Sequence, residues 1–510
     1  MVAVIRSSAV MGVDAFIVQI ETDLANGLPG ITFAGLPDAS VRESRERVTV
    51  AIRNSGFALP PKRITVNLAP ADIRKEGSAF DLGIALSILG ASEQIRMSAS
   101  HETLALGELS LEGFLRPIRG AVAIAADAAK HGVKAIILPK QNAEEAAVIE
   151  GIDVFGAETL VEAARQFNDR SGFEPTQVDL KNMFDHSDRA LPDMADVRGQ
   201  ELAKRALEVA AAGGHNILLI GPPGSGKTML AKRLPSILPR LTFEESFETT
   251  KIHSVAGVLE SGSPLVTTRP FRSPHHSTSM AGLIGGGRIP APGEISLAHN
   301  GVLFMDELPE FSRNALEALR QPLENGTSTI ARAWGSLTFP SRAMVVAAMN
   351  PCPCGYFGDT RRVCSCSQSA LARYQARISG PLLDRIDLHV SAPAVPFEDM
   401  SDPVDAEPSS EARQRVQKAR DAQRNRFKNT SVYCNAMMRS KETRQACILT
   451  DEAEKMFADI LRRLGLSGRG YTQILKVSRT VADMSDSDMI EQKHIAEAVQ
   501  FRCLDRQYLG

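Results

Sequence analysis

The sequence predicts a multidomain protein: an N-terminal α+β domain, a central α/β domain built on a parallel sheet, and a C-terminal helical domain. The chain has 510 residues, more than a single hydrophobic core usually organises. In its middle, short apolar runs alternate with helical patterns, which is typical of a parallel sheet covered on both faces. Polar stretches interrupt this pattern on either side. We therefore place the domains at residues 1–167, 192–395 and 396–510, with a linker at 168–191.

The composition is that of an ordinary globular protein, with 43% hydrophobic and 23% charged residues. A formal net charge of −2 excludes a basic field over the whole surface, although a ring can still gather basic residues in a central pore. The apolar runs fall short of about 18 residues, so we expect no membrane span and no membrane partner. The N-terminal apolar stretch contains Asp14 and lacks the core of a signal peptide. We expect a cytoplasmic protein.

The N-terminal domain mixes strand and helix patterns. Ile64–Leu68 alternates with period two, as in a half-buried strand. Asp81–Leu89 has a helical pattern, and Lys134–Leu138 is a short apolar strand. These patterns predict an α+β domain.

The central domain begins with a helix over Gly199–Ala212, which Gly213-Gly214 ends. An apolar strand follows at Asn216–Ile220, and two more lie at Gly301–Met305 and Ala343–Met349. Buried strands that alternate with helical patterns predict a parallel sheet covered on both faces.

The first strand is followed by a phosphate-binding loop. Its residues are Gly221, Pro222, Pro223, Gly224, Ser225, Gly226, Lys227 and Thr228. The glycines let backbone N–H groups turn inward around phosphates, Lys227 reaches the β- and γ-phosphates, and the Thr228 hydroxyl ligates Mg²⁺. The loop lies between a strand and a helix, as this motif requires, and predicts ATP and Mg²⁺ as ligands.

Polar residues also end the other two strands. Asp306 is expected to hold Mg²⁺ through its water shell, and Glu307 to polarise the attacking water. Asn350 follows the third strand and could orient the same water. The alternatives are a helix cap for the carboxylates and a simple turn before Pro351 for the asparagine. Together the three strand ends predict an ATP-hydrolysing enzyme.

Phosphoryl transfer also needs positive charge near the γ-phosphate. Arg385, in the string PLLDRID, is one candidate, and in a ring it would reach the neighbouring subunit's site. Arg469 and Arg479 are alternative candidates for a second arginine, beside or within a helical pattern at Tyr471–Met484. Each of them could instead be an ordinary surface arginine.

Four of the seven cysteines lie close together in the sequence, at 351–367. They are Cys352, Cys354, Cys364 and Cys366. Four thiolates can bind Zn²⁺ tetrahedrally, but the C-x-C spacing is tighter than usual, so free thiols remain the alternative. The other cysteines are expected to be packing residues. They are Cys434, Cys447 and Cys503.

Two segments are candidates for nucleic-acid contact. Lys251–His299 is too long for a simple strand-to-helix connection, and such insertions are usually functional. It contains polar and basic side chains and a glycine run: Arg272, His275, His276, Gly285, Gly286, Gly287 and Arg288. We expect the adjacent histidines to be polar surface residues rather than metal ligands.

The second segment is a predicted hairpin around Trp334-Gly335. It carries Arg332 and the single tryptophan of the chain, Trp334. An arginine suits phosphate contact and a tryptophan suits base stacking. A hairpin that packs on its own subunit is the alternative.

Several longer strings carry a specific resemblance. They are GLPGITFAGLPDASVRES, NLAPADIRKEGSAFDLGIAL, RPFRSPHHSTSMAGLIGGG, PGEISLAHNGVLFMDELPEF and SGPLLDRIDL. Over nearly the whole chain the sequence resembles the YifB/ComM family of magnesium-chelatase-like AAA+ proteins. The resemblance implies a hexameric ATPase in which Asn350 is sensor 1. Through ComM it implies a DNA helicase that drives branch migration of single-stranded or branched DNA during natural transformation.

The N-terminal domain is similar to the proteolytic domain of Lon, an S5-type α+β fold. The place of Lon's catalytic lysine is held by Val122 and that of its serine by Asp81. Ser78 is nearby but has no basic partner in the motif, and a Ser–Lys dyad needs both members. We therefore expect a non-proteolytic structural or DNA-guiding domain.

Other functions fit the same nucleotide motifs. An AAA+ chaperone or unfoldase would be stimulated by unfolded polypeptide. A metal-insertion ATPase of the magnesium-chelatase type would need an integrin-like partner. The Lon-like N-terminal domain argues against this alternative. A slow, nucleotide-switched scaffold is the third alternative.

Overall fold

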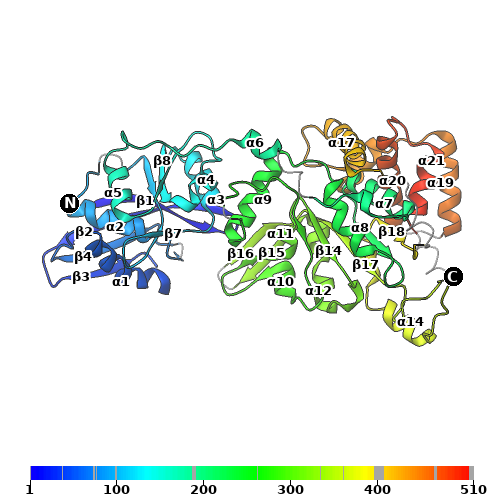
Figure 1. The fold of residues 1–510 in the computed structure, drawn as a ribbon, viewed down its shortest axis with the longest axis horizontal. Coiled ribbons are helices and arrows are strands. Elements are labelled where there is room, and N and C mark those ends of the chain that lie inside the picture. Colours follow the sequence, from blue (N-terminus) through cyan, green and yellow to red (C-terminus); the bar gives the residue numbers. More distant parts are fainter. Residues whose placement is uncertain are drawn as a thin grey trace. The chain divides into compact units, whose positions relative to one another are not determined.

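The computed structural model describes residues 2–36, 38–72, 75, 77–97, 100–185, 191–260, 262–332, 335–359, 361–395, 407–464, 468–502 and 504. The chain divides into two compact units. The first comprises Met1–Asp185 and Phe243–Thr267, and the second comprises His186–Thr242 and Thr268–Gly510. Figure 1 labels the elements of each unit.

The described residues of the first unit form a mixed seven-stranded sheet in the order β3-β4-β2-β1-β5-β8-β9. The strands are β1 (Ala3–Met11), β2 (Asp14–Ala25), β3 (Gly30–Ala34), β4 (Arg63–Ala69), β5 (Thr103–Ala105), β8 (Ala135–Pro139) and β9 (Asp153–Ala157). The β1–β2 and β2–β4 pairs are antiparallel and the others are parallel. A short antiparallel pair, β6 (Glu108–Leu109) with β7 (Leu115–Arg116), lies outside this sheet.

Helices α1, α2 and α5 pack on one face of the sheet and α3 and α4 on the other, whereas α6 and α9 contribute to a small apolar cluster with α3. They are α1 (Ala39–Asn54), α2 (Asp81–Ala91), α3 (Ala121–Lys130), α4 (Lys140–Ala146), α5 (Leu160–Asn168), α6 (Leu180–Asp185) and α9 (Phe243–Ala256). Ile137 belongs to the core with α1, α2 and α5, whereas Ile136 and Leu138 belong to the core with α3 and α4. Alternate strand residues point to opposite faces, so the two cores lie on opposite sides of the sheet.

The segment Phe243–Thr267 lies within the range predicted for the ATPase core, yet it belongs to the first unit. Lys251 Nζ lies 2.6 Å from Asp14 Oδ1, and Ser254 donates a hydrogen bond to Glu145. Leu265 is buried with Val122 in a small apolar cluster. Both ion pairing and apolar burial therefore hold this segment to the N-terminal sheet and helices.

The second unit contains the predicted parallel sheet, which is confirmed. Its order is β11-β14-β17-β10-β18, and every neighbouring pair is parallel. The strands are β10 (Ile217–Ile220), β11 (Phe271–Arg272), β14 (Val302–Met305), β17 (Met344–Met349) and β18 (Leu388–Ser391). Successive residues of β10 alternate between two cores, so apolar layers cover both faces.

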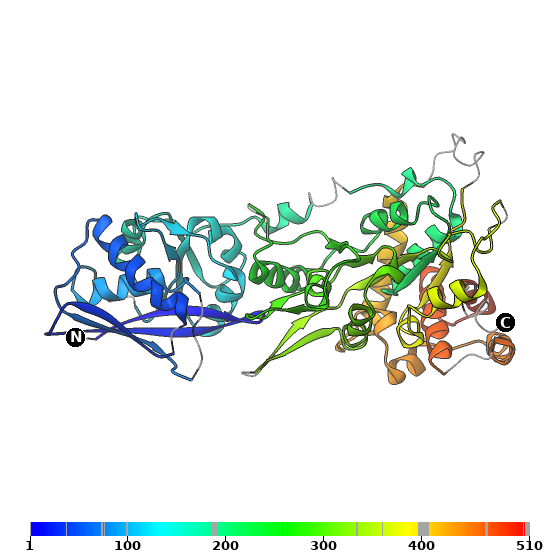
Figure 2. The same ribbon diagram turned by 90° about the horizontal axis from the view of Figure 1, so that it is seen from below.

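Short elements connect these strands. The helices are α7 (Glu201–Gly213), α8 (Lys227–Arg233), α10 (Met280–Ile284), α11 (Glu294–Leu297), α12 (Arg313–Ala318), α13 (Arg320–Asn325), α14 (Gln368–Gln375) and α15 (Gly380–Leu383). Two antiparallel hairpins project from the connections: β12 (Gly285–Gly286) with β13 (Ala291–Pro292), and β15 (Thr327–Arg332) with β16 (Gly335–Pro340). Figure 2 shows the strands of the second hairpin extending away from the parallel sheet.

The C-terminal region is helical, as predicted. It contains α17 (Ser409–Arg426), α18 (Ser440–Ala446), α19 (Asp451–Leu464), α20 (Gly468–Met484) and α21 (Gln492–Gln500). It packs on the sheet domain through α7, because Arg420 donates to the Ala211 and Ala212 carbonyls at the end of that helix. These contacts satisfy backbone acceptors that a helix end leaves unpaired.

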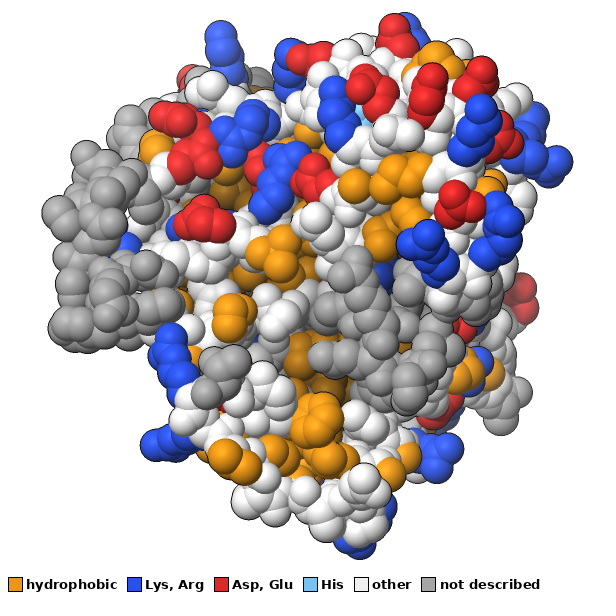
Figure 3. All heavy atoms as spheres, turned by 90° about the vertical axis from the view of Figure 1, so that its right-hand side faces the viewer, with side chains coloured by type: hydrophobic (Ala, Val, Ile, Leu, Met, Phe, Trp, Pro, Cys, Tyr) orange, Lys and Arg blue, Asp and Glu red, His pale blue; other side chains and the backbone are white. Residues whose placement is uncertain are grey.

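On the face of the second unit seen in Figure 3, basic side chains are interspersed with acidic ones among the residues drawn in colour. Hydrophobic side chains gather toward the centre and lower part of this view. This distribution matches the near-neutral net charge of the chain. Across the described residues, no helix combines the length and the apolar character that a membrane crossing requires.

Candidate nucleotide-binding and hydrolysis site

The phosphate-binding loop leaves the sheet from β10, between β17 and β18. Gly221 must be glycine, because a Cβ there would overlap the carbonyl oxygen of Ala392 and lie 2.9 Å from Ser225 Oγ. Gly224 and Gly226 have φ of 76° and 88°, in the left-handed region that favours glycine. The loop then enters α8 at Lys227, so backbone N–H groups are available to an anion at this turn.

The Lys227 ammonium lies inside this loop. Its Nζ donates to the carbonyl oxygens of Gly221 (2.8 Å) and Pro222 (2.9 Å), and lies 3.3 Å from Asn350 Oδ1. Burial lowers the pKa of Lys227 below its ordinary value, and the Asp306 carboxylate opposes this effect. Its contacts are neutral carbonyl and amide oxygens, which are weaker partners for a cation than a phosphate oxygen. The ammonium is thus placed to serve an anion bound in the loop.

Thr228 and Asp306 lie side by side although they are far apart in the sequence. Thr228 Oγ1 donates to Asp306 Oδ2 at 2.8 Å, and the other Asp306 oxygen accepts from the Glu307 backbone N–H at 3.0 Å. Hydroxyl and carboxylate oxygens are the donors that Mg²⁺ prefers. This pair of side chains therefore fits the predicted magnesium site.

Glu307 has an unusual backbone. Its φ and ψ are 50° and 48°, a left-handed conformation that is uncommon for residues other than glycine. Its side chain is 61% exposed, and its Oε2 lies 3.4 Å from His276 Nδ1. Such backbone strain is often found at functional sites.

These side chains line one cavity of about 950 Å³. The phosphate-binding loop, Asp306, Glu307 and Asn350 form one part of its wall. Helix α14 and the turn after it supply another part through Arg373, Tyr374 and Arg377, which sequence reasoning missed. The available signal was the presence of two arginines four residues apart directly after the cysteine cluster.

The side chains of α14 and of the turn after it have defined contacts. Arg377 Nη1 lies 2.7 Å from Glu310 Oε1 and donates to the Pro309 carbonyl at 3.3 Å. Tyr374 is buried, and burial raises its pKa to about 12. The phenol therefore stays neutral while the two arginines supply positive charge at the cavity.

The arginines predicted from the sequence lie elsewhere. Arg385 Nη1 donates to the Pro381 carbonyl at 2.6 Å, and its Nη2 pairs with Glu324. Arg469 Nη2 lies 3.7 Å from the same glutamate, and neither arginine lines the cavity. Arg479 is buried among the C-terminal helices, where its Nε donates to Asp483 Oδ1 at 3.0 Å. Arg479 thus has an internal structural contact, unlike an ordinary surface arginine.

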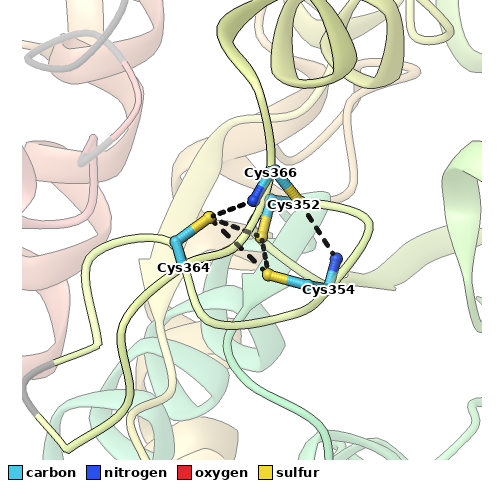
Figure 4. A group of neighbouring side chains, drawn as sticks. All are labelled: Cys352, Cys354, Cys364 and Cys366. Atoms are coloured by element: carbon cyan, nitrogen blue, oxygen red, sulfur yellow. Dashed lines mark hydrogen bonds between the residues drawn. The ribbon is translucent and has the colours of Figure 1, made fainter.

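The four clustered cysteines converge, as Figure 4 shows. Their Sγ atoms all lie within 4.8 Å of one another. The backbone N–H of Cys354 donates to Cys366 Sγ at 3.4 Å, and that of Cys366 to Cys364 Sγ at 3.5 Å. Backbone N–H groups of Tyr356 and Ser365 lower the pKa of Cys354 to about 5. Four convergent sulfurs with N–H donors around them fit a tetrahedral zinc site.

The cysteine loop touches the phosphate-binding loop. Gly355 has φ of 86°, and a Cβ there would overlap Pro223 Cδ and lie 2.8 Å from Pro223 Cγ. Pro353 also lines the cavity, and α14 begins directly after Cys366, with Ser367 as its N-cap. The cysteine loop therefore connects two walls of the cavity. Of the other cysteines, Cys434 and Cys447 are buried, and Cys503 lies outside the described residues.

The two hairpins of the second unit are joined to each other. Arg332 Nε and Nη2 donate to the Gly287 carbonyl at 3.1 and 3.0 Å, and Ser328 Oγ donates to the Ile284 carbonyl at 2.8 Å. Arg288 is exposed. Trp334 lies outside the described residues.

In the first unit, Asp81 is fully buried and accepts from Arg47 Nε at 2.9 Å and Arg47 Nη2 at 3.2 Å. Ser78 donates to Glu108, and Val122 is buried in an apolar cluster. Asp81 and Val122 are thus a salt-bridged acid and a packing residue.

Comparison with known proteins identifies the family. A curated relative, YifB of Escherichia coli (strain K12), is 45% identical over 507 residues, covering 99% of this chain and 97% of that protein. Competence protein ComM of Haemophilus influenzae is also 45% identical, over 506 residues that cover 99% of this chain and 98% of ComM. The chain belongs to the YifB/ComM family.

The family models agree with this assignment. The model described as "Magnesium chelatase, subunit ChlI" matches residues 193–400, "Subunit ChlI of Mg-chelatase" matches 20–142, and "Magnesium chelatase, subunit ChlI C-terminal" matches 406–502. An archaeal Lon protease from Halobacterium salinarum is 27% identical over 109 residues, 21% of this chain and 15% of that protein. The chain is thus a magnesium-chelatase-like ATPase of the AAA+ type.

Proposed function

We propose that this protein is a hexameric, Mg-ATP-driven DNA motor that promotes branch migration when incoming DNA recombines during natural transformation. The observation that carries this proposal is the pair of hairpins in the unit that contains the hydrolysis site, joined by the Arg332 contacts to Gly287. The name of the relative ComM, a competence protein, supports the biological role.

In this proposal each residue of the site has a chemical task. Lys227 and the backbone of the phosphate-binding loop hold the phosphates of ATP. Thr228 and Asp306 would hold Mg²⁺, which would neutralise phosphate charge. Glu307 accepts the proton of the attacking water, and Asn350 orients that water.

Positive charge comes from two sources. Arg373 and Arg377 belong to the same subunit and line the cavity. Arg385 acts in the neighbouring subunit's site. Arg469, at the start of α20, responds to whether a nucleotide is bound. The contacts of both with Glu324 are then released when the ring assembles or binds ATP.

DNA is held by the two hairpins. Arg288 and Arg332 contact phosphates, and Trp334 stacks on a base. The first unit, which we propose is a Lon-like domain without protease activity, guides DNA toward these hairpins.

Steady-state ATPase of the full chain, with and without single-stranded DNA, tests this proposal. We expect DNA to stimulate hydrolysis in the wild type, and the double variant Arg288→Ala/Arg332→Ala to lose that stimulation. Arg462→Ala, which removes an exposed arginine of α19, is the matched control. Stimulation by unfolded polypeptide instead of DNA would favour an unfoldase, and stimulation by neither would refute the motor.

A second experiment tests the assignment of Glu307. Glu307→Gln is expected to abolish hydrolysis while DNA binding in the presence of ATP is retained, because the amide keeps the shape but cannot take a proton. Unchanged ATPase activity in this variant would refute the role of Glu307.

We further propose that the four clustered cysteines bind a structural Zn²⁺. The metal would fix the loop that carries Gly355 and Pro353 and the start of α14, and with it the cavity wall. We expect about one zinc ion per chain in the purified protein, lost in Cys364→Ser/Cys366→Ser and retained in Cys434→Ala. A protein without zinc and with four titratable thiols in this loop would support free cysteines instead.

A further inference from the structure

The proposed function gives a task to the base of the cysteine loop but none to its tip, residues 356–363. The tip lies between the pairs Cys352/Cys354 and Cys364/Cys366, whose Sγ atoms all lie within 4.8 Å of one another. The two ends of the tip are therefore held together. A tip fixed at both ends loses little conformational freedom when it binds a partner, so it is well suited to recognition.

Large apolar and cationic side chains cover the surface of this tip. Phe357 is 45% exposed and Val363 is 95% exposed. Arg361 and Arg362, between them in the sequence, are also exposed. Apolar side chains that gather on an exposed surface with polar neighbours mark a binding site more often than a solvated turn. The tip thus has the character of a contact surface.

The two arginines of the tip contact uncharged groups. Arg361 Nη2 donates to the Ala394 carbonyl at 3.3 Å, and Arg362 Nη1 donates to the Tyr356 hydroxyl at 2.7 Å. The one acidic residue of the tip, Asp359, accepts the backbone N–H groups of both arginines, at 2.6 and 3.1 Å, and so folds the turn. Phosphate oxygens are stronger partners for a guanidinium than the uncharged oxygens that it contacts here.

The combination of arginines and exposed rings fits a single-stranded nucleic acid. Guanidinium groups bind its phosphates, and an aromatic ring stacks on a base whose face is not already covered by a second strand. The Arg362 guanidinium lies 5.0 Å from the centre of the Tyr356 ring, which leaves the Phe357 ring as the one that can receive a base. A second copy of this chain is a poorer match, because acidic and basic side chains are interspersed on the face seen in Figure 3.

The cysteine loop lies far from the hairpins that the proposed function assigns to DNA. Helix α14 begins directly after the last cysteine of the loop, with Ser367 as its N-cap. Figures 1 and 2 place α14 and the β15–β16 hairpin toward opposite ends of the second unit. A strand on the tip is therefore a different stretch of nucleic acid from the one at the hairpins. A branched DNA offers both.

We infer that the tip of the cysteine loop is a second contact for single-stranded nucleic acid. Arg361 and Arg362 bind its phosphates, and Phe357 stacks on a base. The inference rests on the proposed function and adds to it a place for a second strand of the branched substrate.

The test is the affinity of the full-length protein for a fluorescent oligothymidine, measured by anisotropy at several salt concentrations with a non-hydrolysable ATP analogue. The background is Arg288→Ala/Arg332→Ala, which removes the proposed hairpin contacts. Adding Arg361→Ala/Arg362→Ala is expected to raise Kd about tenfold and to reduce the slope of log Kd against log salt by about 1.4, since each lost phosphate contact removes about 0.7. Adding Arg462→Ala instead is expected to leave both unchanged.

Two variants of Phe357 separate base stacking from apolar packing. Phe357→Leu keeps an apolar side chain without an aromatic face and is expected to raise Kd about tenfold. Phe357→Trp keeps the aromatic face and is expected to bind as tightly as the parent protein. The Tm of each variant checks that it is folded. Normal binding by Phe357→Leu, with an altered oligomeric state in Arg361→Ala/Arg362→Ala, would assign the tip to a second copy of the chain and overturn the inference.

Failure of this inference is distinguishable from failure of the proposed function. If DNA stimulates the ATPase of the wild type but Arg288→Ala/Arg332→Ala no longer binds the oligothymidine, the motor stands and the tip has no contact of its own. If DNA does not stimulate the wild type, the motor is refuted. Binding that still depends on Phe357 and on the two arginines would then support the contact at the tip.

Discussion

Replacing Gly355 by alanine tests whether the cysteine loop shapes the nucleotide site. Gly355 and Gly358 lie on the same loop and both have left-handed backbones, with φ of 86° and 78°. A Cβ at Gly355 would overlap the ring of Pro223, whereas a Cβ at Gly358 would meet no atom within 4 Å. Gly358→Ala is therefore a matched control that shares the backbone effect and lacks the collision.

The expected magnitude follows from these two effects. A left-handed backbone costs an alanine about 1–2 kcal/mol, and both variants bear this cost. Gly355→Ala adds an overlap with Pro223, and such overpacking costs about 1–3 kcal/mol or displaces the neighbour. Pro223 belongs to the phosphate-binding loop. If the overlap destabilises the ATP-binding conformation of this loop by about 1.4 kcal/mol, ATP affinity drops about tenfold.

The assay is the dependence of steady-state ATPase on ATP concentration, with zinc content measured in parallel. We expect KM to rise about tenfold in Gly355→Ala and to stay within about twofold in Gly358→Ala. Equal KM values in the two variants would refute the coupling between the cysteine loop and the phosphate-binding loop.

Three other predictions follow from buried groups. Burial lowers the pKa of His494 below its ordinary value of 6.5. Its neutral ring accepts the N-cap N–H of α21. The contribution of the neutral His494 ring to the free energy of unfolding is therefore complete above pH about 6.5. It is lost as the pH falls through the pKa of His494 in the folded state. The difference in Tm between the wild type and His494→Gln should change between pH 8 and pH 5. A difference in Tm that stays constant would contradict this assignment. Arg47→Met should destabilise the first unit by about 3–5 kcal/mol by leaving the buried Asp81 unpaired. In Arg47→Met, the rate of hydrogen exchange in α2 should rise, and adding Asp81→Leu should largely restore the wild-type rate. An unchanged rate in Arg47→Met would refute the role of the ion pair. Gly221→Ala should abolish ATP binding in a fluorescent-nucleotide titration, because its Cβ meets the Ala392 carbonyl; normal binding would show that the loop adapts.

The parts of the site that were predicted from the sequence are encoded locally. The apolar runs that become β10, β14 and β17 are each bounded by polar or glycine residues, and the chemistry follows directly after each strand. A parallel sheet then brings these ends together, so the pairing of Thr228 with Asp306 can be expected from their positions after two such strands.

The parts of the site and fold that were not predicted from the sequence depend on contacts that no local sequence pattern encodes. Arg373 and Arg377 line the cavity from the segment that follows the cysteine loop, and that loop lies against Pro223. His276 meets Glu307 because β11 lies at the sheet edge beside β14, and a two-residue strand has no usable periodicity. The segment Phe243–Thr267 packs with the first unit through single contacts such as Lys251 with Asp14, which sequence spacing does not reveal.

Branch migration of a synthetic four-way DNA junction tests the central claim most directly. The wild-type protein with Mg²⁺ and ATP is expected to convert a mobile junction into its duplex products, whereas Lys227→Ala is expected to leave the junction intact. Junction conversion that is absent in the wild type, or equal in Lys227→Ala, would contradict an ATP-driven DNA motor.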